Sequence, residues 1–383
     1  YVITGAAINA SSYGGVFMDT PTSQIWVGTL DVTSIGTSAR ANVVGGPYII
    51  EASGLMALPG FSINYVNSGL LTITPATVSL SAIKTYDGNI NLTGTQVTIT
   101  TGIAGQTLTY SGATSNSPNV STASYINAIT LGDCSGVGCK GAASNYQLPS
   151  LTAASANNAV TINRATVGLS ASKNYDGNIN LTGTQVTITT GITGESLTYT
   201  SATSTSANVA ASNKYINAIT LGDCSGVDCK GAASNYQLPA LNRSNAPVTI
   251  TPATVSLSAI KTYDGNINLT GTQVTITTGI AGQTLTYSGA TSNSPNVSTA
   301  SYINAITLGD CSGVGCKGAA SNYQLPSLTA ASANNAVTIN RATVGLSASK
   351  NYDGNINLTG TQVTITTGIT GESLTYTSAT STS

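Results

Sequence analysis

Histidine is absent from this 383-residue chain, and charged residues make up only 7% of it. Ordinary soluble domains have about 25% charged residues. In this chain Ser, Thr, Asn and Gly must therefore form most of the hydrated surface. Twelve basic and 13 acidic residues give a net charge of −1. With no basic run to neutralise phosphates, we expect no nucleic-acid partner. Because acid–base chemistry near neutral pH would need a perturbed carboxylate or amine, we expect no enzymatic activity, catalytic residue or cofactor.

Long apolar runs are also missing. No stretch of 18 or more apolar residues occurs, so the sequence predicts no membrane span. The chain begins at Tyr1 and has no secretory signal pattern, so we expect a segment of a longer gene product whose export signal lies elsewhere. With 40% apolar residues and almost no net charge, the chain should fold rather than stay disordered.

Internal repetition dominates what is present. The stretch 72–206 recurs residue for residue at 249–383, and a looser repeat inside it places a Lys-x-Tyr-Asp-Gly signature every 88 or 89 residues. The four signatures are Tyr86, Asp87 and Gly88; Tyr175, Asp176 and Gly177; Tyr263, Asp264 and Gly265; and Tyr352, Asp353 and Gly354. We divide the chain into a more distant first module (1–73), module A1 (74–162), module B1 (163–250), module A2 (251–339) and a partial module B2 (340–383).

Each module has the alternation of β-strands. Val97 and Ile99 alternate with threonines, and six or seven such short segments occur in about 88 residues between Gly, Asn, Ser and Pro clusters. This predicts an all-β tandem array of small antiparallel, immunoglobulin-like sandwiches. A β-grasp-like module is the alternative, although the best helical candidate, 151–157, is short. Module ends run into the next opening strand without a linker, as at 160–167, which predicts an elongated array.

The cysteines form three pairs with identical C-x4-C spacing. Two thiols per module without histidine cannot complete a tetrahedral zinc site, so we expect no metal. A redox site would require the spacing C-x-x-C, which these pairs do not have. The remaining interpretation is one local disulfide in each module that has a cysteine pair. Because disulfides persist in oxidising compartments, we expect a location outside the cytoplasm. The expected pairs are Cys134 with Cys139, Cys224 with Cys229, and Cys311 with Cys316.

The Tyr-Asp-Gly signature admits two interpretations. Asp87, Asn89 and Asn91 have the alternate spacing of a calcium loop, but the distal bidentate acid is missing. A tight turn, with Gly88 at positive φ and Asp87 capping it, is the better hypothesis. We expect Lys84 to lie near Asp87 as an exposed pair that contributes little.

Several motifs together resemble a known family. The Lys-x-Tyr-Asp-Gly opening, the Ala-Ser-Asn-Tyr-x-Leu segment and the closing Val-Thr-Ile-x-x-Ala-Thr-Val are similar to the YDG-type repeats of large bacterial surface proteins. The first module, with Tyr13-Gly14-Gly15 and residues 62–73, resembles the related MBG-type repeat. Such modules occur in filamentous-haemagglutinin-like adhesins, so the resemblance implies a long extracellular stretch without catalytic residues.

Three functions follow as hypotheses. The leading one is a non-enzymatic stalk segment of a long extracellular bacterial adhesin or surface fibre, whose partners are neighbouring modules or like chains. The second is that each module binds a glycan or host protein, with avidity from repetition. The third is a subunit of an extracellular filament or sheath, assembled through β-edges that carry few protective charges.

Overall fold

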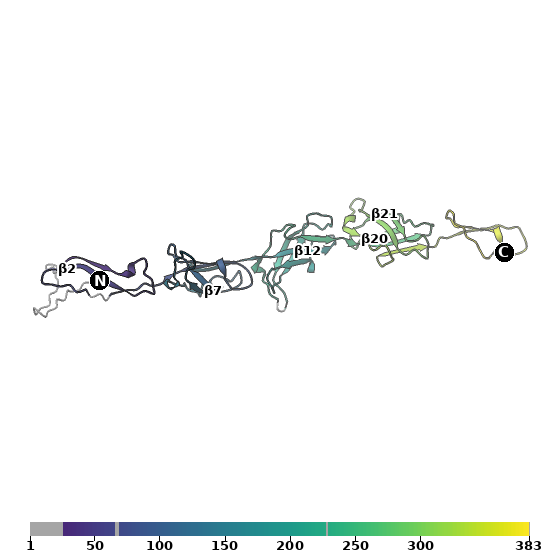
Figure 1. Ribbon diagram of the computed structural model, residues 1–383. Coiled ribbons are helices and arrows are strands. Elements are labelled where there is room, and N and C mark those ends of the chain that lie inside the picture. Colours follow the sequence, from purple (N-terminus) through teal and green to yellow (C-terminus); the bar gives the residue numbers. More distant parts are fainter. Residues whose placement is uncertain (1–25, 66–68, 227–228, 383) are drawn as a thin grey trace. The chain divides into compact units, whose positions relative to one another are not determined.

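The computed structural model describes residues 26–65, 69–226 and 229–382. This part of the chain is all-β, as predicted: its strands alternate with single-turn 3-10 helices, and none of its helices is an α-helix. The chain divides into two compact units, residues 1–165 and 166–383. Both consist of the repeated modules (Figure 1).

The first module forms one antiparallel sheet in the order β1-β2-β3. Its described part contains β1 (Trp26–Thr33), η2 (Ile35–Thr37), β2 (Tyr48–Ala57) and β3 (Gly69–Leu71). The predicted Tyr13-Gly14-Gly15 signature lies outside the described residues.

The three complete modules share one order of elements. Module A1 contains β4 (Ala76–Thr77), β5 (Ser79–Thr85), η3 (Gly94–Gln96), β6 (Val97–Thr100), β7 (Thr109–Ser115), β8 (Ile126–Gly132), η4 (Ala143–Asn145), β9 (Tyr146–Gln147) and β10 (Asn158–Asn163). Module B1 contains β11 (Ala165–Thr166), β12 (Gly168–Asn174), η5 (Gly183–Gln185), β13 (Val186–Thr189), β14 (Thr198–Ser204), β15 (Ile216–Gly222), η6 (Ala233–Asn235), β16 (Tyr236–Gln237) and β17 (Val248–Thr251). Module A2 contains β18 (Ala253–Thr254), β19 (Ser256–Thr262), η7 (Gly271–Gln273), β20 (Val274–Thr277), β21 (Thr286–Ser292), β22 (Ile303–Gly309), η8 (Ala320–Asn322), β23 (Tyr323–Gln324) and β24 (Asn335–Asn340).

The partial module B2 has β25 (Gly345–Ala348), β26 (Asn357–Leu358), η9 (Gly360–Gln362), β27 (Val363–Thr366) and β28 (Ala379–Thr380). Its strands form two small antiparallel sheets, β25-β27 and β26-β28. In sequence it corresponds to residues 163–206 of B1, the first half of a B module.

Each complete module pairs its first long strand with its last. In A1, β6 is antiparallel to β5 on one side, while β10 runs parallel to β5 on the other. The same mixed sheet recurs as β13-β12-β17 and β20-β19-β24. The antiparallel expectation therefore fails for this pairing, and also for the short parallel pairs β4 with β9 and β18 with β23. A parallel neighbour needs a crossover of a dozen or more residues. Residues 86–157, which lie between β5 and β10 and include β6, β7, β8 and β9, provide it.

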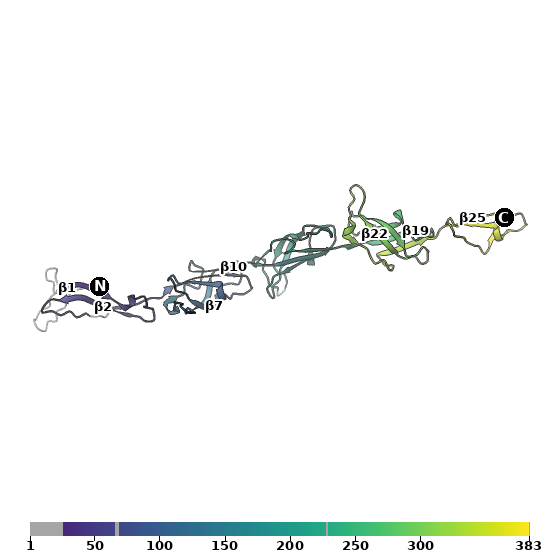
Figure 2. The ribbon, with the colours of Figure 1, turned by 45° about the horizontal axis from the view of Figure 1, so that its top comes forward.

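A separate antiparallel hairpin completes each module: β7 with β8, β14 with β15, and β21 with β22. In A2, β22 makes contacts with both β19 and β24, so the hairpin and the three-stranded sheet share one core (Figure 2). The central parallel pair is a feature of the β-grasp alternative. The segment 151–157, its helical candidate, forms turns instead.

Alternation places every second residue of the central strand in the core. On β5, Leu80, Ala82 and Lys84 are buried, while Ser81 and Ile83 are exposed. Facing strands contribute Val160, Ile162 and Ile126 in the same way. These side chains are small to medium in size, so each module has a modest apolar core.

A buried asparagine ties the last strand of module A1 to its hairpin. The side chain of Asn158 is fully buried, accepts a hydrogen bond from Ile126 N at 2.9 Å and donates to Ile126 O and Ser150 O. Asn335 repeats these contacts in A2. In B1, the backbone carbonyl of Ala246 accepts from Ile216 N instead. The region where the last strand begins is therefore bonded to the hairpin through an asparagine side chain in the A modules and through a backbone carbonyl in B1.

We predict that replacing Asn158 and Asn335 with Ala lowers the unfolding free energy of the A modules by about 2–3 kcal/mol, because buried backbone groups lose their partners. Urea denaturation of the full chain should show the A modules unfolding earlier. As a control, Asn157→Ala with Asn334→Ala removes only exposed hydrogen bonds to Ser79 and Ser256. Equal loss from both pairs of substitutions would contradict the prediction.

Candidate functional sites at the signature loop and the module joints

The Tyr-Asp-Gly loop closes around a buried lysine. In A1, Lys84 Nζ lies 2.6 Å from Asp87 Oδ1 and donates to the carbonyl oxygens of Asn89 and Asn91 at 3.1 and 2.9 Å. Lys173, Lys261 and Lys350 make the same contacts in the other copies. The loop oxygens that resembled a calcium site thus surround an ammonium group supplied by the chain itself.

The pairing of Lys84 with Asp87 was predicted correctly, but its exposure was not. Lys84 is only 3% exposed. It occupies the next inward position of β5 after Leu80 and Ala82, so strand alternation carries its aliphatic stem through the core. The buried ammonium then needs the carboxylate and carbonyl oxygens as partners, and this need fixes the shape of the loop.

The aspartates of two copies of this loop, Asp264 and Asp353, have a lowered pKa. For Asp264, burial opposes ionisation, but hydrogen bonds from Lys261 and from the backbone N–H of Asn266 outweigh it and lower the pKa. For Asp353, hydrogen bonds from Lys350 and the backbone of Asn355 lower the pKa. The ionised carboxylate is therefore the form that stabilises the folded loop.

The turn itself has the geometry that the sequence predicts. Asp87 Oδ1 accepts from Asn89 N, and Gly88 has a φ of 78°. Glycine has a second role in B1 and A2. A Cβ added at Gly177 would lie 2.9 Å from the side-chain nitrogen of Gln283, and one at Gly265 would lie 3.0 Å from Ile369. A side chain at either position would require side chains of the next module to move.

The tyrosine of the signature makes the contact between B1 and A2. Tyr175 OH donates to Gln283 Oε1 at 3.0 Å, and its ring meets that of Tyr323 edge-on at 5.4 Å. Tyr323 OH donates to the same Gln283 oxygen at 2.6 Å. The side-chain carbonyl oxygen of Gln283 thus accepts hydrogen bonds from two tyrosine hydroxyls, one in B1 and one in A2.

An asparagine forms the other half of this joint. Asn322 Oδ1 accepts from the backbone N–H of Val209 at 2.8 Å, and Asn322 Nδ2 donates to Asn208 Oδ1 at 3.1 Å. The same geometry occurs in the other unit, where Asn145 Oδ1 accepts from Val43 N at 2.9 Å. The Asn of the Ser-Asn-Tyr segment therefore binds an Asn-Val loop of the preceding module in both units.

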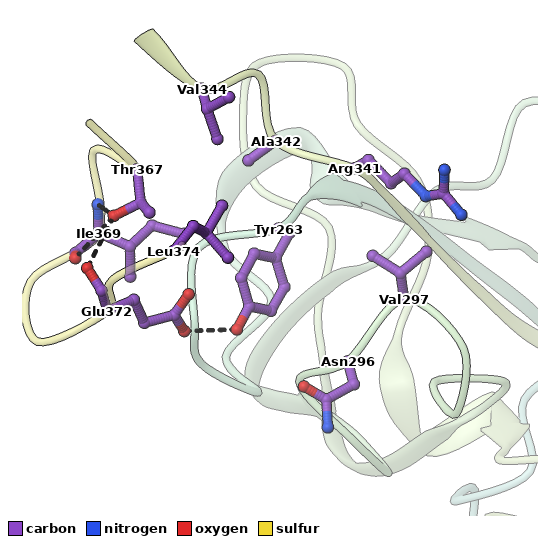
Figure 3. Close-up of a pocket in the computed structure, with 10 residues that line it drawn as sticks. All are labelled: Tyr263, Asn296, Val297, Arg341, Ala342, Val344, Thr367, Ile369, Glu372 and Leu374. Carbon is purple, nitrogen blue, oxygen red and sulfur yellow. Dashed lines mark hydrogen bonds between the residues drawn. The ribbon is translucent and has the colours of Figure 1, made fainter. Parts of the chain in front are cut away.

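Between A2 and B2 the corresponding surface contains a cavity of about 330 Å³. Tyr263 OH donates to Glu372 Oε1 across it (Figure 3). This hydrogen bond is the main reason that the pKa of Tyr263 lies above its ordinary value. Asn296, Val297 and Leu374 also line the cavity.

Sequence reasoning found the signature residues but assigned them only a turn. The joints bring together residues that the sequence left unassigned: the Asn-Val pairs of each loop and the Gln or Glu at positions 283 and 372. The signal was present, since an Asn-Val pair occurs at positions 42, 119, 208 and 296, once in each of the first four modules. Its meaning depends on contacts across more than 100 residues.

The disulfides close a short loop at the side of each complete module. Cys134 pairs with Cys139, Cys224 with Cys229, and Cys311 with Cys316, with Cα–Cα distances of 5.8, 5.7 and 5.7 Å. The loop is anchored where Cys134 N donates to Gly141 O and Thr107 N donates to Lys140 O. The valines at the tips, Val137 and Val314, are fully exposed. Stable disulfides indicate a location outside the cytoplasm.

Residues 26–65, 69–226 and 229–382 contain no cluster of three or more His, Cys, Asp or Glu side chains that could hold a metal ion. None of their helices is long and apolar enough to cross a membrane. No family model, curated protein or solved structure matches the chain.

We predict that Lys261→Met lowers the unfolding free energy of A2 by about 2–3 kcal/mol, because the carbonyls of Asn266 and Asn268 lose a charged donor. The matched control is Lys317→Met, an exposed lysine of the same module, which should change stability by less than about 0.5 kcal/mol.

The pH dependence of stability gives a second measurement of the same ion pair. Because the folded pKa of Asp264 is lowered, its stabilisation is present above the unfolded pKa of about 3.9 and is lost as pH falls through the folded value.

Asp264→Asn should therefore flatten the acid limb of the stability curve, measured by urea denaturation from pH 6 downward. The side chain is 44% exposed, so screening limits this contribution to about 1 kcal/mol or less. An unchanged acid limb would show that the pair does not stabilise the fold.

We predict that all six cysteines are oxidised within their own modules. Intact mass and alkylation without reductant should find no free thiol, and proteolysis should release no peptide that links two modules. Reduction should lower the stability of each complete module by about 2 kcal/mol, the chain-entropy value for a six-residue loop. Free thiols in the protein from its natural host would contradict this pairing and the location.

Proposed function

We propose that this chain is a non-enzymatic structural segment of a long extracellular bacterial adhesin or surface fibre, in which it serves as a stalk. The disulfides and the β modules support an extracellular role. The similarity of its motifs to YDG-type repeats supports the bacterial surface. The signature residues support a structural role, because they stabilise a loop or join modules.

The observation that carries the proposal is the parallel pairing of the first long strand with the last strand of each complete module. In A1 these strands are β5 and β10, which lie side by side in the same direction. Tension on the two ends of a module therefore pulls the paired strands past each other along their length. All hydrogen bonds of the ladder must then break together, whereas an antiparallel end pair would open one bond at a time.

The two module types differ in the length of this ladder. In A1 and A2 six residue pairs join the two strands, from Leu80 with Asn158 and from Leu257 with Asn335. In B1 only four pairs do so, from Ala171 with Val248 to Asn174 with Thr251. If tension is the working load, B modules should yield at lower force than A modules.

Single-molecule pulling of the full chain by its two ends tests the proposal. We expect separate unfolding events, each releasing about 300 Å of chain, as about 88 residues extend by about 3.4 Å each. The events of B1 should come at lower force than those of A1 and A2. Reduction of the disulfides should lengthen each event without changing this order.

The ladder can be weakened without touching the core. Thr161→Pro with Thr338→Pro removes a backbone donor from the middle of each A ladder at exposed positions, and should lower the unfolding force of the A modules to that of B1 or below. Thr161→Val with Thr338→Val is the matched control. Smooth extension without force peaks, or A modules that yield before B1, would refute the tension-bearing role.

A further inference from the structure

The disulfide loops of the A modules have an inner and an outer cysteine. In A1 the outer cysteine, Cys139, is exposed, whereas the inner one, Cys134, is half-buried. Cys316 and Cys311 repeat this asymmetry in A2. Apart from the inner cysteine, all residues of 133–140 are exposed. The outer sulfur of each pair is therefore accessible to a molecule in solution.

A hydroxyl group lies against the inner sulfur. Thr107 Oγ1 lies 2.9 Å from Cys134 Sγ and 3.3 Å from Cys139 Sγ, and the hydroxyl is the donor because a disulfide carries no proton. Thr284 makes the same contacts in A2, at 2.8 and 3.4 Å. The corresponding residue of B1 is Ser196, which lies 2.9 Å from the inner sulfur of its pair. The A and B sequences differ at this position, yet both place a hydroxyl on the inner cysteine.

The backbone of the loop holds this hydroxyl in place. Thr107 N donates to Lys140 O at 2.8 Å, and Cys134 N donates to Gly141 O at 2.9 Å. Gly141 has a φ of 144°, and a Cβ there would lie 2.1 Å from the carbonyl oxygen of Thr107. Glycine therefore permits the close approach that brings Thr107 against the disulfide. Gly318 is placed in the same way in A2.

We propose that the disulfides of A1 and A2 are sites of thiol–disulfide exchange, at which a thiolate from another molecule attacks the outer sulfur. In A1 a bond forms between the attacking sulfur and Cys139 Sγ, and the bond between Cys139 and Cys134 breaks. The electron pair stays on Cys134 as a thiolate, which water then protonates. One S–S bond replaces another, so the step needs no oxidant or reductant besides the thiol itself. The product is a mixed disulfide that attaches the thiol-bearing molecule covalently to the chain.

The surroundings of the two sulfurs favour this direction of attack. A Cβ added at Gly138 would meet no atom within 4 Å, so the space beside Cys139 is open. Lys140, an exposed cation that directly follows Cys139 in sequence, attracts an anionic nucleophile. The Thr107 hydroxyl is closer to Cys134, and its hydrogen bond strengthens as negative charge develops on that sulfur. Access to the attacked sulfur and stabilisation of the leaving thiolate are both factors that control exchange rates.

The ligand class is an accessible thiol, either a cysteine of a partner protein or a low-molecular-mass thiol. This chemistry differs from that of a C-x-x-C dithiol catalyst, because the chain itself becomes part of the product. The inner thiolate can attack the mixed disulfide in turn, close the loop and release the partner, so the attachment is reversible. The role depends on the disulfide loop and not on the strand ladder, and it is therefore independent of the proposed stalk function.

The test treats the full, folded chain with millimolar glutathione and stops the reaction with N-ethylmaleimide, which caps the freed thiol. Mapping of the tryptic peptides 85–140 and 262–317 should find glutathione on the outer cysteine and maleimide on the inner one. A small protein with a single exposed cysteine, used in place of glutathione, should give a crosslinked species that reductant releases. Reaction with both thiols would support exchange with partner proteins, and reaction with glutathione alone would support exchange with low-molecular-mass thiols.

Variants at the hydroxyl test the stabilisation of the leaving thiolate. Thr107→Val with Thr284→Val should slow the exchange in the A modules at least about fivefold, because a hydrogen bond to a developing charge is lost. Thr107→Ser with Thr284→Ser should retain the rate, since Ser196 makes the same contact in B1.

The matched control is Thr109→Val with Thr286→Val. These hydroxyls anchor the same loop by donating to the carbonyl oxygens of Asp133 and Asp310, and their loss should change the rate by less than about twofold. Equal slowing by both pairs of substitutions would show that only the shape of the loop matters, and would overturn the role of the hydroxyl on sulfur. Glutathione found first on the inner cysteine, or no adduct unless urea unfolds the chain, would overturn the proposal as a whole.

Discussion

The parallel pairing of the first long strand with the last strand of each complete module is the constraint on which the rest of the structure depends. In A1 it joins β5 and β10, which lie about 78 residues apart in sequence, so the module closes only when nearly all of its chain is in place. The pairing forms the central sheet, buries the alternating face of β5, and directs Lys84 toward the loop that follows. It also determines how tension on the two ends of a module would act on its hydrogen bonds.

The signature loop depends on this sheet. Because Lys84 is held inside, its ammonium must be neutralised and solvated by the protein, and Asp87 with the carbonyls of Asn89 and Asn91 does so. The loop is then shaped so that the preceding tyrosine and the following glycine face the next module, as at Tyr175 and Gly177. A short motif thus stabilises its own module and presents the surface that joins the next.

The joints use few and repeated contacts. The groups that make these contacts are an Asn-Val loop, an Asn side chain, two tyrosines and one Gln or Glu. The signature tyrosine donates to Gln283 at the B1–A2 joint and to Glu372 at the A2–B2 joint, so the acceptors of the two joints differ in charge while the donor is a tyrosine hydroxyl in both. This economy suits a repeat chain, because one module sequence can serve at many positions.

Sequence alone determined the repeat, the β period, the disulfide pairs and the turn at Gly88, because each is a local pattern or a self-comparison. It missed the parallel strand, the burial of Lys84 and the joints, because each depends on partners that are distant in the chain. The clearest case is Leu169 and Leu346, which lie in identical sequence from 97 residues before to 37 residues after each leucine. Leu169 is buried in the complete module B1, whereas Leu346 is exposed in the partial module B2. Strand alternation decides which face a side chain takes, and only the strand that packs against that face decides whether water is excluded from it.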